Sequence, residues 1–139
     1  MNANPLSARI EARPVPDGER PMALPRHFGH RMLLVENAVF DWLRELSPDY
    51  DGGYWRFLEL SNGGFYMVPD TERRFRIEVL SNGYVGRMSA DAAGITSCLF
   101  AYSHLSFRFP DERLGCHYQQ LLAFAGEHAE AAAIGAATD

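Results

Sequence analysis

The chain has 139 residues, 47% of them hydrophobic and 22% charged, which fits one globular domain and excludes a disordered protein. Thirteen basic against 18 acidic residues give a formal net charge of −5. That charge gives no basic excess for strong non-specific nucleic-acid binding, and it is too small to imitate the phosphates of DNA. No apolar run approaches the about 18 residues of a membrane helix, and the N-terminus lacks the apolar core of a secretory signal, so we expect a cytoplasmic protein.

Residues 1–21 are rich in proline, and we expect a flexible N-terminal segment there, followed by a single domain over residues 22–139. From Phe28 to Leu46 apolar residues recur at helical spacing, which predicts an amphipathic helix. Glu36 projects close to the apolar stripe of this helix. It is either a carboxylate at the rim, paired with an arginine or a tyrosine hydroxyl, or a residue that binds a partner.

Short strands joined by polar turns follow, at about residues 54–60, 65–68, 74–80 and 84–88. Asn-Gly pairs at 62–63 and 82–83 suit hairpin turns, because asparagine and glycine tolerate positive φ. Apolar and polar residues alternate in the third strand, which indicates one packed face and one partly solvated face. The pattern predicts an antiparallel meander.

The last third of the chain predicts two helices and a short alanine-rich turn. Ser89 is suited to cap a helix that begins at Ala90, and the absence of charge over residues 92–103 indicates burial on more than one face. Another helix begins near Pro110. The predicted order is α-β-β-β-β-α-α. The predicted fold is an α+β two-layer sandwich, with helices on one face of a four-stranded antiparallel meander sheet.

The residues offer no recognisable catalytic motif. There is no glycine-rich phosphate loop and no nucleophile elbow. His27 and His30 would share one helix face, but no third ligand is near in sequence, so we expect no metal site. We also expect no enzymatic activity, no cofactor and no small-molecule substrate. The remaining side chains of interest are predicted to be buried free thiols, Cys98 and Cys116, and surface or rim histidines, His104, His117 and His128.

Several stretches resemble the KlcA/ArdB antirestriction family. They are LPRHFG at 24–29, MLLVENAVF at 32–40, YDGGYW at 50–55, ELSNGGFYMVPD at 59–70, SNGYVGRMSADAAGI at 81–95 and LFA at 99–101. The resemblance runs from about residue 22 to 101 and more loosely to the end. It implies that residues 22–139 form a single antirestriction domain. Such a protein is carried by a plasmid or another mobile element and helps incoming DNA evade host type I restriction–modification, without catalysis and without a cofactor.

The resembling segments concentrate on turns, so we expect a contact surface rather than a pocket. Aromatic residues often anchor interfaces. Asp139 is the last residue, and its negative charge near the C-terminus of a helix would oppose the helix dipole. Helix stability therefore does not explain this acid, which is either a contact residue or part of a disordered tail. The contact candidates are Glu36, Tyr54, Trp55, Asn62, Asp70 and Asp139. The expected partner is the type I restriction–modification machinery, contacted directly or indirectly, with weak or absent DNA binding.

Two other functions remain open on the residues alone. One is a small nucleic-acid-binding regulator that stacks bases on an aromatic sheet face, with the arginines at 73, 74 and 76 beside it. The other is a small hydrolase, which would need a pocket that brings Glu36 or Asp70 to a histidine.

Overall fold

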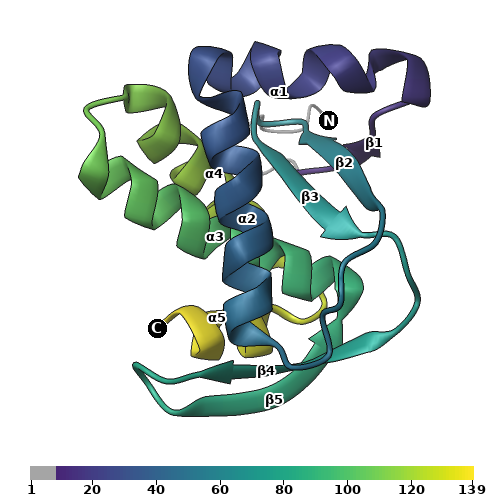
Figure 1. Ribbon diagram of the computed structural model, residues 1–139, viewed down its shortest axis with the longest axis vertical. Helices are drawn as coiled ribbons and strands as arrows, with labels where there is room; N and C mark the ends of the chain where they lie inside the picture. Colours follow the sequence, from purple (N-terminus) through teal and green to yellow (C-terminus); the bar gives the residue numbers. More distant parts are fainter. Residues whose placement is uncertain (1–8) are drawn as a thin grey trace, which may run out of the picture.

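The computed structural model describes residues 9–139 (Figure 1). Its strands are β1 (Ala12–Pro14), β2 (Trp55–Leu60), β3 (Phe65–Pro69), β4 (Arg74–Val79) and β5 (Tyr84–Ser89). Its helices are α1 (Arg20–Phe28), α2 (Met32–Leu46), α3 (Ala90–Arg108), α4 (Glu112–Glu127) and α5 (Ala131–Thr138). The α+β class predicted from the sequence is confirmed.

The strands do not form the single four-stranded sheet that the sequence predicts. Strand β2 pairs with β1 on one side and β3 on the other, whereas β4 pairs only with β5. The loop after β3 carries the chain away, so the β4–β5 hairpin lies at the opposite end of the molecule (Figure 1). Helix α3 packs against β3 and against both strands of the hairpin. The two sheets are therefore joined through a helix and not through a strand pairing.

The segment before residue 22 also differs from the flexible chain that was expected. Strand β1 adds to the free edge of β2, with Ala12 opposite Leu60. Val15 is buried, and its N–H donates to the carbonyl of Phe57 at 2.8 Å. Helix α1 then begins at Arg20. The unsatisfied backbone groups at the β2 edge explain why this segment is held. The expected flexible residues 1–8 lie outside the described part of the chain.

Helix α3 lies at the centre of the core, as the absence of charge over residues 92–103 predicts. The Ser89 hydroxyl accepts the N–H of Ala92 at 3.1 Å, which confirms the predicted cap. Every residue over 92–99 is buried. The helix approaches β3 so closely that a Cβ added to Gly94 would lie 2.5 Å from the carbonyl oxygen of Met67. Although α3 has 19 residues, neither it nor any other described helix is long and apolar enough to cross a membrane.

The C-terminal residues form helix α5 instead of the short turn that was expected. Ile134 and Ala137 are buried, and they anchor the helix. The side-chain amide of Asn82, in the β4–β5 turn, donates to the carbonyls of Ala137 at 3.0 Å and Asp139 at 2.9 Å. The tail is therefore held against the hairpin, which excludes the disordered alternative for Asp139.

Candidate functional site

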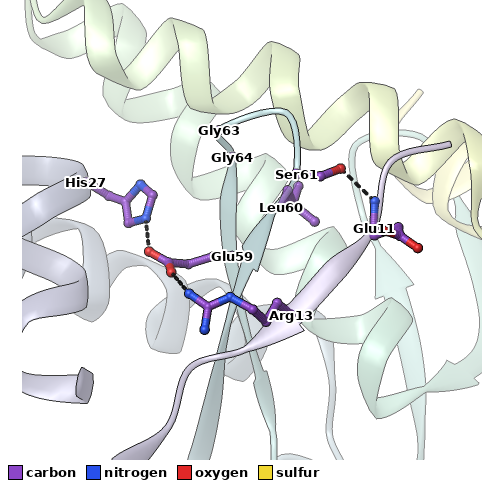
Figure 2. Close-up of a pocket in the computed structure, with 8 residues that line it drawn as sticks. All are labelled: Glu11, Arg13, His27, Glu59, Leu60, Ser61, Gly63 and Gly64. Carbon is purple, nitrogen blue, oxygen red and sulfur yellow. Dashed lines mark hydrogen bonds and ion pairs between the residues drawn. The ribbon is translucent and has the colours of Figure 1, made fainter. Parts of the chain in front are cut away.

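A hollow of about 400 Å³ lies beside the β1–β2 edge, and Glu59 of β2 is its charged centre (Figure 2). The Glu59 carboxylate accepts hydrogen bonds from Nη2 of Arg13 at 2.8 Å and Nη2 of Arg26 at 2.9 Å. Nε2 of His27 donates to it at 2.7 Å. Figure 2 shows Arg13 and His27 reaching Glu59 from opposite sides. One carboxylate thus joins β1, α1 and β2.

The surroundings of Glu59 keep it ionised. Burial pushes its pKa up, but the hydrogen bonds from His27 and Arg26 and the Arg26 charge outweigh burial, so the pKa is lowered. A carboxylate that is already bonded to three cationic or ring donors is a weak proton acceptor. The cluster is suited to fastening three elements together, and it is poorly suited to acid–base catalysis.

His117 of α4 lies behind this hollow and is buried, which corrects the prediction of a surface or rim residue. Its ring centroid is 5.0 Å from that of His27 and 4.6 Å from that of Phe28. Burial, together with the nearby His27, lowers the pKa of His117 to about 4. The imidazole is therefore neutral at physiological pH and packs as an aromatic ring.

A second carboxylate–histidine pair ties the α4–α5 loop to the start of α3. Nε2 of His128 donates to Asp91 at 2.7 Å, and the hydroxyl of Tyr66 donates to the same carboxylate at 3.0 Å. The N–H of Glu130 donates to Nδ1 of His128 at 2.9 Å. The hydrogen bond to Asp91 raises the pKa of His128, while the N–H of Glu130 requires an unprotonated Nδ1. Because both ring nitrogens are engaged, this histidine is also a structural link.

The structure separates the two aromatic contact candidates. Trp55 is 3% exposed, and its indole N–H donates to the Tyr50 hydroxyl at 3.1 Å. Its selection as a contact residue is wrong, because a partner cannot reach a side chain in the core. Tyr54 is 56% exposed. The guanidinium of Arg20 lies 4.5 Å from its ring centroid.

Asp70 and Tyr54 lie at the same end of the β2–β3 hairpin. The N–H of Asp70 donates to the carbonyl of Tyr54 at 2.8 Å. The exposed Asp70 carboxylate is 3.5 Å from Nε of Arg56. Half-buried Glu36 is close to this region, because it shares a hollow of about 330 Å³ with Arg20. Within the described residues Glu36 has no ion pair or hydrogen bond, so the pairing considered for it is not formed.

Asn62 and Asp139 lie elsewhere and have structural contacts. The amide nitrogen of Asn62 donates to the Gln120 carbonyl at 2.9 Å, and its Oδ1 accepts the N–H of Gly64 at 3.0 Å. Asn62 thereby fixes the β2–β3 turn against α4, at the far end of the hairpin from Tyr54. Asp139 lies beside the β4–β5 turn through its bond with Asn82. The candidates brought together directly are therefore Tyr54 and Asp70, and Glu36 is linked to them through Arg20.

The geometry does not favour either alternative function. The aromatic side chains expected on a base-stacking face are buried, apart from Tyr54; they are Trp55, Phe57, Phe65 and Tyr66. Arg76 is paired with Glu78 at 2.9 Å, and Arg73 with Asp51 at 3.7 Å. The carboxylate–histidine pairs within residues 9–139 involve neither Glu36 nor Asp70.

Sequence reasoning missed the Glu59 cluster. The donors to Glu59 lie 46, 33 and 32 residues away along the chain. Glu59 itself occupies an ordinary position in a predicted strand. No local spacing signals such a cluster, because its members meet only after α1 and β1 have packed on β2.

Comparisons with known proteins point to one family. A family model described as "Antirestriction protein" matches residues 48–139. An Escherichia coli protein named Antirestriction protein KlcA is 47% identical, over 96% of this chain and 97% of the relative. A second Escherichia coli protein of that name is 42% identical, over 94% of this chain and 95% of the relative.

The likeness extends to three dimensions. A solved structure aligns with a TM-score of 0.89 and 42% identity, covering 100% of both chains. It belongs to work on the KlcA and ArdB proteins, described as showing a novel fold and antirestriction activity against type I DNA restriction systems in vivo but not in vitro. The likeness therefore includes β1, α1 and α2, which precede the region matched by the family model.

Proposed function

The chain belongs to the antirestriction protein family, and from this premise we propose that it protects incoming DNA from type I restriction–modification systems inside the cell. The observation that carries the proposal is full-length similarity, in sequence and in fold, to proteins with that activity. We place the protein in the cytoplasm, where incoming DNA meets these enzymes, and its gene on a plasmid or another mobile element.

The proposed mechanism is non-enzymatic and uses a surface. Support comes from the two carboxylate–histidine pairs, whose polar atoms are already engaged in fastening structural elements. The contact surface proposed is the Tyr54 face, defined as Tyr54, Asp70, Glu36 and Leu33. Tyr54 and Leu33 are 56% and 61% exposed, and Arg20 joins them, because it lies over the Tyr54 ring and lines a hollow with Leu33 and Glu36. An exposed aromatic and an aliphatic side chain with a charged rim suit a protein partner.

The proposal also includes an indirect route to the restriction enzyme. The solved relative shows antirestriction in vivo but not in vitro. The same behaviour in this chain would mean that another cellular component takes part. Direct contact with the restriction enzyme would instead give inhibition with purified components.

Plating of phage tests the function. The chain is expressed in cells that carry a type I system, and unmodified phage is plated beside phage that already bears the host modification. We expect expression to raise the plating of unmodified phage and to leave that of modified phage unchanged. Unchanged restriction across several type I systems would refute the proposed function.

Variants of the Tyr54 face test the surface. Tyr54→Ala and Asp70→Asn alter exposed side chains, and the Arg56–Asp70 pair is exposed at 3.5 Å, so each should change stability by less than about 1 kcal/mol. We expect both variants to fold and to lose antirestriction. Gln119→Ala, at an exposed position of α4, is the matched control. Full protection by both folded variants would exclude this face.

A further inference from the structure

A hollow of about 260 Å³ lies between the C-terminal half of α2, the end of β4 and the middle of α3, and Trp42 is its principal aromatic wall. The Trp42 ring stacks on Phe100, with centroids 4.7 Å apart and planes 17° apart. The His104 ring centroid lies 4.6 Å from that of Trp42. Trp42 and Phe100 are only half-buried, so these rings form a surface wall rather than core.

The charged side chains around this wall are acidic. Glu45 and Glu78 both line the hollow, and Glu45 also lines a neighbouring hollow of about 250 Å³ with Asp41 and Trp42. Asp41 is paired with Arg44 at 3.0 Å, and Glu78 with Arg76. Glu45 is exposed and, within residues 9–139, has no ion-pair partner. The Trp42 wall therefore carries unbalanced negative charge.

Several tyrosine and phenylalanine rings of the described chain already have a cation over them. Arginine guanidinium groups lie over the rings of tyrosine and phenylalanine at several places in the described chain, for instance Arg20 over Phe57 at 4.0 Å and Arg31 over Phe109 at 4.3 Å. Indole attracts cations more strongly than either ring. Yet no arginine of the described chain lies over Trp42. The indole of Trp42, the type of ring best suited to a cation, is thus open to a cation from outside.

An apolar side chain completes the rim. Leu80, which directly follows β4, is 91% exposed and lines the same hollow. Arginine and lysine lay their aliphatic stems on apolar surface and extend their charged heads beyond it. Leu80 offers such a surface next to carboxylates and an indole. The hollow is smaller than the about 300 Å³ at which sites for drug-sized ligands begin, so it suits one side chain.

We propose that the Trp42 groove, defined as Trp42, Glu45, Glu78, Leu80 and Phe100, binds an arginine side chain of a partner protein. The stem packs on Leu80, and the planar guanidinium lies on the indole and hydrogen-bonds to the glutamates. The net charge of −5 favours the approach of a basic partner segment. This assignment is independent of the Tyr54 face and of the antirestriction proposal.

A titration followed by the indole N–H resonances tests the proposal. The chain has two tryptophans, so two indole signals are expected. Trp55 is an internal control, because its N–H is held by Tyr50 in the core. The full-length protein is titrated with the peptide acetyl-Gly-Arg-Gly-amide and, separately, with the same peptide carrying citrulline, which is nearly isosteric and uncharged.

We expect the Trp42 signal to shift saturably with the arginine peptide, in the millimolar range, while the Trp55 signal stays in place. The citrulline peptide should bind at least about tenfold more weakly, because it lacks the charge that the indole and the glutamates recognise. An absent shift, or equal affinity for the two peptides, would overturn the proposal. A Trp42 shift that follows protein concentration without peptide would assign the groove to a second copy and also overturn it.

Charge-removing variants make the assignment residue-specific. Glu45→Gln combined with Glu78→Gln should weaken arginine binding at least about fivefold, whereas Glu72→Gln, at an exposed turn, should leave it unchanged. Equal urea midpoints would show that all variants fold. Undiminished binding by the folded double variant would refute the role of the glutamates.

Discussion

Replacing Gly94 with alanine tests how closely α3 packs on β3. Gly94 lies in a helix, where alanine is normally preferred by about 1 kcal/mol. Here, however, the added methyl group would lie 2.5 Å from the carbonyl oxygen of Met67 and 2.8 Å from Cα of Val68. Both are backbone atoms of strand β3, so neither can rotate away as the end of a flexible side chain could.

The two contributions oppose each other, and the overpacking should win. Forcing an extra methyl group into a packed core costs about 1–3 kcal/mol, and the rigid backbone of β3 places this site at the upper end. After subtracting the about 1 kcal/mol gained in helix propensity, we expect a net loss of roughly 2 kcal/mol in the free energy of unfolding. For a domain of this size that lowers Tm by roughly 6–10 °C.

Urea denaturation followed by circular dichroism measures the effect, and Gly115→Ala is the matched control. Gly115 also lies inside a helix, α4, but no non-neighbouring heavy atom lies within 4 Å of its added Cβ. Gly115→Ala should therefore stabilise the protein by about 0.5–1 kcal/mol. If Gly94→Ala were as stable as Gly115→Ala, the close approach of α3 to β3 would be refuted.

Three further predictions concern the links between elements. Asn62→Ala should lower the free energy of unfolding by about 1–2 kcal/mol, because it leaves the buried Gly64 N–H and the Gln120 carbonyl without their partner. Asn37→Ala, on the exposed side of α2, should change the free energy of unfolding little in the same urea measurement. For His117, the folded pKa of about 4 lies below the ordinary value near 6.5, so the unfolded chain binds the proton first. The contribution of His117 to the free energy of unfolding is complete above pH 6.5 and falls by about 3 kcal/mol between pH 6.5 and 4. His117→Leu should lose that part of the pH dependence. If the free energy of unfolding of this variant fell with pH as steeply as that of the wild type, the buried neutral ring would be contradicted. Finally, a thiol reagent should modify exposed Cys116 in the native protein and not Cys98, because burial raises the pKa of Cys98 to about 12; rapid reaction persisting in Cys116→Ser would contradict this.

The burial of the two cysteines could be predicted from the sequence for Cys98 but not for Cys116. Both cysteines were expected to be buried, and both lie in helices, but only Cys98 faces the core. Residues 92–103 of helix α3 include no charged side chain to mark a solvated side, so the burial of this stretch was predicted correctly. In α4, which has both polar and apolar sides, a single cysteine does not indicate which side it occupies.

Tyr54 and Trp55 make the same point for the candidate site. The sequence selects both as aromatic residues beside a turn. Adjacent residues of an extended chain point to opposite faces, but the sequence does not indicate which of the two faces is packed. Packing decides that Trp55 lies under Phe40 and Tyr50 while Tyr54 remains exposed beside Arg20. Likewise, the sequence around Glu59 does not indicate that three donors from β1 and α1 bind its carboxylate.

The sequence by itself determined the features that neighbouring residues encode. These are the α+β class, the amphipathic α2, the Asn-Gly turns, the Ser89 cap and the buried α3. Only the tertiary structure decided that β3 and β4 do not pair, that β1 occupies the edge of β2, and that Arg20 lies between Tyr54 and the hollow lined by Glu36. Alternation within a strand fixes which residues share a face, but the neighbouring strand is chosen by long-range packing, here the seating of α3 between the two sheets.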